Sequence, residues 1–298
     1  MTHKPATRDF FRKARQMKGY PVTEWLHGYL YMKFPYAYIG NAKGDLPLGR
    51  FVQRVIAAWQ RLFPPRPKPA DPDRVTFPDT YHGKVVPLGT AKQLVSVREP
   101  IQQAYPEQVI PYKLARDLIL EHPDHIVALD CPCRASKPNP CLPLDVCLIV
   151  GEPFAGMVME HHADKARWVE RDEAVAILEA EEQRGHVHHA FFKQAVLGRF
   201  YAICNCCSCC CGAMQAHQHG TPMLASSGYL SRVDVENCAG CGACVAVCQF
   251  HALSLAGGHS QVDEALCMGC GVCVSHCPNE ALALELAPHK GAPLELPA

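Results

Sequence analysis

Two cysteine-rich segments near the C-terminus carry the most specific chemistry in this sequence. Both have the spacing C-x2-C-x2-C-x3-C, and the second begins 29 positions after the first. Their cysteines are Cys238, Cys241, Cys244 and Cys248 in the first segment and Cys267, Cys270, Cys273 and Cys277 in the second. Three thiolates at x2 spacing fit around one four-iron cubane, and the fourth cysteine reaches a second cubane.

The spacing therefore predicts two [4Fe-4S] clusters that exchange their fourth ligands. Cluster I takes Cys238, Cys241, Cys244 and Cys277, and cluster II takes Cys267, Cys270, Cys273 and Cys248. Because cysteine fills every iron position, such clusters carry electrons and leave no iron open to a substrate. Four-cysteine zinc sites are the competing interpretation, but zinc does not need a third cysteine at this spacing.

Residues 230–288 resemble the bacterial dicluster ferredoxins, and these two segments carry the resemblance. The resemblance implies a pseudo-twofold module that passes low-potential electrons. The family pattern places a proline after each fourth cysteine, and Pro278 matches it. Gln249 departs from it, which concerns the local turn and the shielding of cluster II from solvent.

Ten further cysteines lie between residues 131 and 211. They are Cys131, Cys133, Cys141 and Cys147, followed by Cys204, Cys206, Cys207, Cys209, Cys210 and Cys211. Since adjacent cysteines point in different directions, we do not expect one cluster to use both members of a pair. Ten thiols could bind two more cubanes with two thiols to spare, or one larger or differently ligated cluster.

The order Cys-x-Cys-Arg, Gly-His-Val-His and Ile-Cys-Asn-Cys-Cys-x-Cys-Cys-Cys is similar to a second group. This group consists of bacterial and archaeal "4Fe-4S dicluster domain" proteins, and the resemblance spans about residues 105–288. It implies one or two further iron–sulfur clusters in the central region. The absence of Asp, Glu, Lys and Arg from Phe200 to Ser231 favours the same assignment, because a buried anionic cluster there would have few counter-charges.

Other interpretations of the central region stay open. The first four of its cysteines could form a zinc knuckle, the whole set could store metal, and Cys206-Cys207 or Cys209-Cys210 could form a vicinal disulfide. Arg134 could donate to a cluster sulfide or lie at the surface. The histidines His161, His162, His186, His188 and His189 could include a cluster ligand or proton carrier, or be surface residues. The sequence has no dinucleotide fingerprint, P-loop or Ser/His/Asp arrangement.

The N-terminal residues 1–68 differ from the rest in charge. They hold 13 Lys and Arg against 3 Asp and Glu, so their net charge is +10 and that of residues 69–298 is −10. Apolar residues from Leu48 to Phe63 follow helical spacing, with arginines on the opposite face. We expect this region to dock on a redox protein or oxidoreductase complex, or to contact a membrane peripherally, and we expect no nucleic-acid binding.

These patterns predict an α+β protein in which a pseudo-twofold ferredoxin-type dicluster module follows a mixed cysteine-rich domain. A helix is predicted over 112–122, short strands over 126–129 and 146–150, and a helix from Asp172 to Gly185. The predicted divisions are a docking region (1–68), a Pro-rich connector (69–95), a cysteine-rich domain (96–227), the ferredoxin module (228–288) and a flexible tail (289–298).

We expect a cytoplasmic protein, because residues 1–20 lack the apolar segment of a secretory leader. The predicted function is the transfer of low-potential electrons between a donor and a larger redox enzyme, as a carrier or an electron-transfer subunit of an oxidoreductase. One alternative is a subunit whose central cluster acts on a substrate, as in heterodisulfide reductases. The other is a redox sensor.

Overall fold

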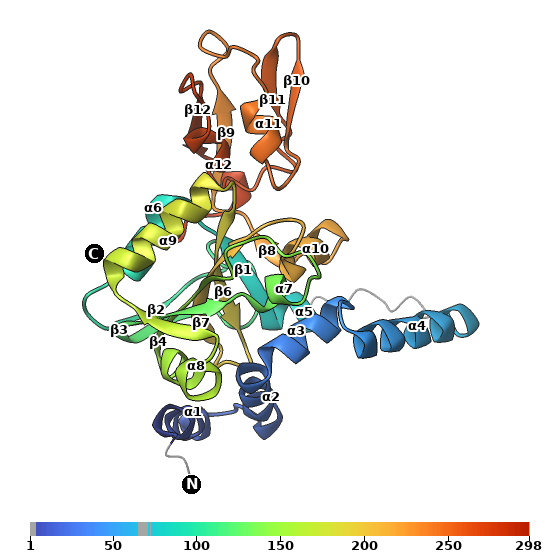
Figure 1. The fold of residues 1–298 in the computed structure, drawn as a ribbon, viewed down its shortest axis with the longest axis vertical. Coiled ribbons are helices and arrows are strands. Elements are labelled where there is room, and N and C mark those ends of the chain that lie inside the picture. The colour runs from blue at the N-terminus through green and yellow to red at the C-terminus, as the bar shows by residue number, and fades with distance from the viewer. Residues whose placement is uncertain (1–3, 65–70, 72, 298) are drawn as a thin grey trace.

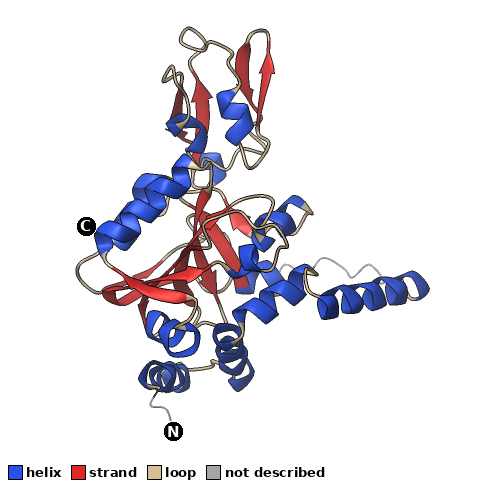
Figure 2. Cartoon of the chain, in the orientation of Figure 1, coloured by secondary structure: helices blue, strands red, loops and turns tan. Residues whose placement is uncertain are grey.

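A mixed eight-stranded sheet forms the centre of the molecule in the computed structural model, which describes residues 4–64, 71 and 73–297 (Figure 1, Figure 2). Seven strands follow the order β2-β3-β4-β7-β6-β1-β8, and β5 pairs with β3. The strands are β1 (Tyr81–Val85), β2 (Ile101–Ala104), β3 (Asp117–Asp130), β4 (Asp145–Glu152), β5 (Ala166–Val169), β6 (Val187–Lys193), β7 (Arg199–Cys206) and β8 (Leu224–Ala225). The fold is therefore α+β, as predicted.

Helices cover both faces of this sheet, and its strands are therefore buried on both sides. In β4, Cys147 and Ile149 pack in one apolar cluster, while Leu148 and Val150 pack in another. The cysteine-bearing face is covered by α1 (Pro5–Gln16), α2 (Val22–Lys33) and α8 (Phe154–His162). The opposite face is covered by α6 (Leu88–Val95) and α9 (Arg171–Gln183).

The helix predicted over 112–122 is wrong, because β3 begins at Asp117. Leu118 and Leu120 are buried at alternate positions, and residues 117–120 pair with β2. Leu114 and Leu118, four apart, fit a helix, whereas Leu118 and Leu120, two apart, fit a strand. Pairing with the neighbouring β2 decides for the strand. The strand predictions around Ile126–Leu129 and Val146–Val150 are confirmed within β3 and β4, and α9 confirms the helix, with Gly185 at φ +78° behind it.

The N-terminal region divides into a part that packs on the sheet and a part that does not. Glu160 of α8 accepts hydrogen bonds from Ala6 N and Thr7 N, at 2.6 and 3.0 Å, and so caps α1. A Cβ atom on Gly28 would lie 1.7 Å from Ala195 O, so α2 approaches the body closely. After α3 (Pro35–Lys43), α4 (Pro47–Leu62) extends away from the body (Figure 1).

The C-terminal module consists of two antiparallel pairs of strands and two short helices. Strands β9 (Tyr229–Val233) and β12 (Leu282–Leu286) pair antiparallel, as do β10 (Leu253–Ala256) and β11 (His259–Val262). The helices α11 (Ala243–Val247) and α12 (Val272–Ser275) contain the third cysteine of each repeat, Cys244 and Cys273. The module forms one end of the molecule (Figure 1).

Two of the predicted divisions differ from the structure. Within the predicted connector 69–95, residues 65–70 and 72 lie outside the described residues, but α5 (Phe77–Thr80), β1 and α6 belong to the folded domain. The predicted flexible tail 289–298 instead packs on that domain. It contributes Leu294, which is 3% exposed, and Ala292 O, which accepts a hydrogen bond from Lys84 Nζ at 2.8 Å.

The remaining short helices are α7 (Pro132–Ala135), α10 (Gly212–Gln218) and the 3-10 helix at Pro288–Lys290. Across the described residues, no helix combines the length and the apolar character needed to cross a membrane.

Candidate metal centres

The predicted ligands of cluster I surround one small cavity. The cavity measures about 20 Å³, and Ser260 and Pro278 also contribute to its wall. Its cysteines are Cys238, Cys241, Cys244 and Cys277. Three of them come from the first repeat and one from the second, which is the set that the spacing predicts.

The predicted ligands of cluster II surround a second cavity of about 20 Å³. Ser231, Phe250 and Met268 complete this wall. Its cysteines are Cys248, Cys267, Cys270 and Cys273. The two cavities therefore have the same size and each combines three cysteines of one repeat with the fourth cysteine of the other.

Glycines at equivalent positions let the backbone turn tightly around each cavity. Gly240 and Gly269 both have a φ of +64°, in the left-handed region that favours glycine. A Cβ atom on Gly240 would lie 2.2 Å from Gly258 O, and one on Gly269 would lie 2.1 Å from Tyr229 O. Any side chain at these two positions would push the loop away from its neighbour.

Hydroxyl and amide groups approach the sulfur atoms in both repeats. Ser260 Oγ lies 3.3 Å from Cys244 Sγ, and Ser231 Oγ lies 3.3 Å from Cys273 Sγ. Backbone N–H groups donate to three more sulfurs, from Ala252 to Cys248, from Ala281 to Cys277 and from Ser260 to Cys238. Donors placed in this way stabilise thiolate charge, so thiols, cavities and donors fit a [4Fe-4S] cluster at each site.

Burial makes two thiols of the second cavity, Cys270 and Cys273, poor acids in the absence of a cation. It raises the pKa of Cys273 to about 11 and raises that of Cys270 well above its usual range. A coordinating metal removes this penalty, because it holds the thiolate form outright.

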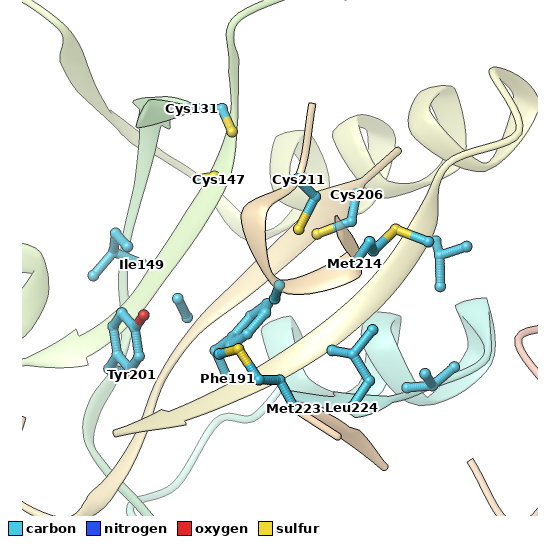
Figure 3. Packing of buried hydrophobic residues seen from close by; sticks show 14 of the residues in the cluster. Cys131, Cys147, Ile149, Phe191, Tyr201, Cys206, Cys211, Met214, Met223 and Leu224 are labelled. Atoms are coloured by element: carbon cyan, nitrogen blue, oxygen red, sulfur yellow. The ribbon is translucent and has the colours of Figure 1, made fainter. Parts of the chain in front are cut away.

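Six of the ten central thiols form a closed ring on the sheet face covered by α1 and α2. All six line one cavity, and they neighbour one another in the order Cys131, Cys133, Cys211, Cys206, Cys204, Cys147 and back to Cys131. The Cys147 and Cys204 sulfurs, for example, are 3.9 Å apart. The end of β3, the middle of β4 and the end of β7 bring these residues together. Figure 3 shows four of them beside Tyr201 and Ile149.

A cavity of about 70 Å³ lies at this ring, and all six thiols contribute to its wall. Cys207 and Cys210 also border it, but most of the remaining wall is aromatic or aliphatic. The hydroxyls of Tyr31 and Tyr201 lie 2.8 Å apart at its edge. The cavity is therefore a thiol-lined space in the apolar core of the domain.

The other four thiols gather separately. All lie within 4.8 Å of one another, with sulfur–sulfur distances of 3.3 Å for Cys141–Cys209, 3.8 Å for Cys141–Cys207 and 3.7 Å for Cys209–Cys210. This four-thiol group comprises Cys141, Cys207, Cys209 and Cys210. Cys209 is exposed, so the group borders the surface.

The two groups divide the adjacent cysteines in part as expected. Cys206 and Cys211 belong to the ring, whereas their neighbours Cys207 and Cys210 belong to the four-thiol group. We expected no site to use both members of an adjacent pair, but Cys209 and Cys210 both belong to the four-thiol group. A zinc knuckle of the first four central cysteines does not match this arrangement, because Cys141 is separated from the other three. All 18 cysteines are free, so neither vicinal disulfide is present.

Helices α2 and α3 cover the ring, which the sequence did not predict. Tyr31, Met32, Pro35 and Ile39 line the cavity. Lys43 Nζ donates to Cys133 O at 2.8 Å and so holds the end of α3 over the ring. Part of the region predicted to serve only for docking, namely α2 and α3, therefore belongs to the wall of the central site.

Arg134 is buried, which excludes the surface interpretation. Its guanidinium contacts Glu181 Oε2 at 2.5 Å and donates to Asn205 O at 3.0 Å. Burial opposes ionisation of Glu181, but hydrogen bonds with His186 and Arg134 outweigh it and lower the pKa of this carboxyl. The arginine thus joins α7, α9 and β7, and its contacts are to oxygen and nitrogen atoms.

The five histidines make contacts other than with thiols in the described structure. His186 pairs with Glu181, and His188 Nδ1 lies 2.6 Å from Asn205 Oδ1. His161 contacts Thr7, and His162 contacts Met32 O. His189 is buried, and burial lowers its pKa to about 3, so it is neutral. These residues serve as core and interface side chains here.

A comparison with protein families identifies the 4Fe-4S binding domain at residues 232–254 and 260–283. Each matched segment contains one cysteine repeat, so the match supports a ferredoxin-type module with 4Fe-4S clusters. A comparison with curated proteins gives no match for this chain. The match indicates iron–sulfur electron transfer, and the many cysteines outside it suggest further clusters.

Gln249 is a residue whose contacts the sequence did not predict. Its side-chain oxygen lies 2.9 Å from both Ser208 N and Ser208 Oγ, and its amide donates to Gly185 O at 3.0 Å. Ser208 separates Cys207 from Cys209. The sequence did mark Gln249 as a departure from the ferredoxin pattern, but the spacing of residues could not predict that it contacts Ser208.

Proposed function

We propose that this chain is an electron-transfer protein, or the electron-transfer subunit of an oxidoreductase, in which two [4Fe-4S] clusters pass low-potential electrons to metal centres of the central domain. Cluster I would be bound by Cys238, Cys241, Cys244 and Cys277, and cluster II by Cys267, Cys270, Cys273 and Cys248. The equal cavities and the repeated serine contacts support this pseudo-twofold exchange of the fourth ligands. When bound, each cluster supplies one-electron chemistry.

The burial of the two ligand sets supports an order for the two clusters. Cys267 is buried in the same apolar cluster as the thiol ring, and Cys248 packs against that cluster. Cys241 of the other set is exposed. Cluster I would therefore face an external donor or acceptor, and cluster II would face the central domain.

The contact of Gln249 with Ser208 is the observation that carries this proposal. It joins the residue after a predicted cluster II ligand to the loop of the four-thiol group. Two further contacts hold the same interface, from Ser275 Oγ to Glu182 at 2.8 Å and from His276 Nε2 to Gln183 O at 3.2 Å. A proline at position 249 could make none of the three Gln249 contacts.

Freeze-quench EPR on the anaerobically reconstituted full chain tests the proposal. We expect about eight irons from the C-terminal module and electrons that move from its clusters to a central centre. Gln249→Ala should slow this internal step while leaving both ferredoxin signals intact. Gln261→Ala, on the exposed strand β11, is the matched control. A Gln249→Ala protein with unchanged internal kinetics would contradict the proposed route.

We also propose that α4 contacts an acidic surface of a redox partner protein. The helix is exposed on all sides over residues 50–62, and its apolar side chains include Phe51, Val55 and Trp59. Its charged residues are Arg50, Arg54 and Arg61, with no Asp or Glu. This combination supports an acidic protein with an apolar centre as the partner.

The α4 proposal is tested by pull-down of the redox partner at rising salt. Removing residues 47–63 should abolish capture, and 1 M salt should weaken but not abolish capture by the intact chain. Arg54→Glu should reduce capture, with Arg98→Glu in the central domain as the control. Binding of the chain to anionic vesicles without capture of a protein would favour membrane contact instead.

A further inference from the structure

We propose that the ten central thiols form two different metal sites: the ring of six binds one iron–sulfur cluster larger than a cubane, and the four-thiol group binds a single tetrahedral metal ion. The proposal rests on the proposed function in that iron–sulfur clusters reach the central domain. It goes further by assigning each thiol to a site and by giving the two sites different chemistry.

The number of thiols in the ring is the first argument. A [4Fe-4S] cubane offers one terminal position on each of four irons, and cysteine can fill four of them. The ring presents six sulfurs that line one cavity and neighbour one another around a closed path, with Cys147 and Cys204 3.9 Å apart. Six thiolates around one space need either more than four irons or thiolates that bridge two irons.

The ferredoxin module supplies a measure of size within the same chain. Each of its cavities is about 20 Å³ and is surrounded by four thiols. The cavity at the ring is about 70 Å³, and the six ring thiols line it together with Cys207 and Cys210. Thiol number and cavity volume therefore increase together from the cubane sites to the ring, as expected for a larger inorganic core.

The walls of the ring cavity favour a buried metal cluster over water. Four of the six cysteines are buried, and the neighbours are apolar residues such as Ile149, Val158 and Phe191. Water in a cavity needs two to four polar partners, whereas the Tyr31 and Tyr201 hydroxyls in these walls already bond to each other at 2.8 Å. A cluster bound to six sulfurs needs no polar partners beyond its ligands.

The four-thiol group is compact, in contrast to the ring, whose thiols surround a cavity. Its sulfurs are 3.3–3.8 Å apart where measured, and all four lie within 4.8 Å of one another. A tetrahedral ion with metal–sulfur bonds of about 2.3 Å places its sulfurs roughly 3.8 Å apart. Among the described residues, neither ferredoxin set brings three thiols that close together. The group is therefore too contracted for a cubane and suits one zinc or iron ion.

The sequence explains how one loop can serve both sites. In Cys206-Cys207 and Cys210-Cys211, the outer members point into the ring and the inner members point to the four-thiol group. The single ion would fix residues 207–210, and thereby the two ring ligands on either side. It would act as a structural support next to Ser208, the residue that Gln249 contacts.

Native mass spectrometry of the anaerobic full chain, with iron, zinc and sulfide analysis, tests the assignment. The intact protein should hold the two ferredoxin clusters, one further cluster with more than four irons, and one single ion. Cys147→Ser should remove more than four irons together with their sulfide. Cys209→Ser should remove one metal ion and leave the sulfide content unchanged. Cys241→Ser, at the exposed ferredoxin ligand, is the control and should affect cluster I alone.

Three outcomes separate failure of this inference from failure of the proposed function. A central cluster with four irons in the intact chain would overturn the larger cluster, and loss of sulfide from Cys209→Ser would overturn the single ion, while electron transfer to the centre would stand. A central domain that holds metal but no sulfide would overturn both this inference and the proposed function. The intact chain gives the iron, zinc and sulfide totals itself, so the test of the larger cluster does not depend on the folding of a variant.

Discussion

Ser231 and Ser260 place one hydroxyl beside each ferredoxin site, 3.3 Å from Cys273 Sγ and Cys244 Sγ. A hydroxyl that donates to a ligand sulfur stabilises the more negative, reduced cluster and so raises its potential. Ser260→Ala should therefore lower the midpoint potential of cluster I by a few tens of mV, the equivalent of about 1 kcal/mol. Ser231→Ala should do the same to cluster II.

Redox titration followed by EPR measures both midpoints in each variant. The exposed Ser254→Ala is the control and should shift neither potential. If Ser260→Ala moved the signal of the cluster that Cys248→Ser damages, the assignment of Cys244 to cluster I would be incorrect.

His82 makes a pH-dependent contribution at a site far from the thiols. It is fully buried on β1 and stacks on Tyr112, and burial lowers its pKa to about 4. The unfolded chain has a histidine pKa of about 6.5, so between pH 6.5 and 4 the unfolded state binds the extra proton and folding stability falls with falling pH. From pH 7.5 to 5.5 the loss should be about 1.4 kcal/mol.

Chemical denaturation at both pH values checks this expectation. His82→Gln should be less stable at pH 7.5 but should lose about 1.4 kcal/mol less than the parent on acidification. His289→Gln, at an exposed position, should keep the full pH dependence. If the free energy of unfolding changed equally with pH in His82→Gln and in the parent, another group would be responsible for the pH dependence.

At the scale of elements, the N-terminal helices have two different roles. Helices α2 and α3 line the cavity at the thiol ring, whereas α4 leaves its apolar side chains exposed. Removing residues 47–63 should therefore leave the iron content, the sulfide content and the EPR spectrum unchanged. Met32→Asp, which places a charge in the cavity wall, should remove the central cluster and spare the two ferredoxin signals.

The same metal analysis and EPR serve as the measurement, and Leu48→Asp on the exposed stripe of α4 is the matched control. Loss of iron on removal of α4 would show that this helix also supports the centre.

The elements also show what a sequence can and cannot predict. The long helices α4 and α9 follow from regular apolar spacing, and the ferredoxin repeats follow from ligand spacing. Residues 81–85, with Gly83 and Lys84, lack the apolar alternation of a strand, yet β1 pairs with β6 on one side and with the edge strand β8 on the other. The division of the ten central thiols depends on where β3, β4 and β7 end in space, and no spacing along the chain encodes that.

At the scale of the whole molecule, the chain leaves the central domain for the ferredoxin module and then returns. Leu294 is buried in the core with α6 and α9, and Tyr105 Oη donates to Glu295 O at 2.8 Å. Leu294→Ala should therefore destabilise the central domain by about 2–3 kcal/mol, as large-to-small core changes do. Denaturation monitors the loss, and the ferredoxin EPR signals should persist.

The exposed Leu286→Ala, at 62% exposure, is the comparison and should cost under about 0.5 kcal/mol. A Leu294→Ala protein as stable as the parent would mean that the C-terminal segment contributes little to the core.

The return of the chain has a consequence for how the clusters can work together. A redox module attached by one flexible linker searches for its target by diffusion, so its rate responds to solvent viscosity and linker length. This module is attached at both of its ends, before Tyr229 and after Leu286, and Gln249 and Ser275 hold it between them. Its clusters therefore keep fixed distances to the central thiols. Internal electron transfer should accordingly run at the same rate in glycerol as in water and at any protein concentration.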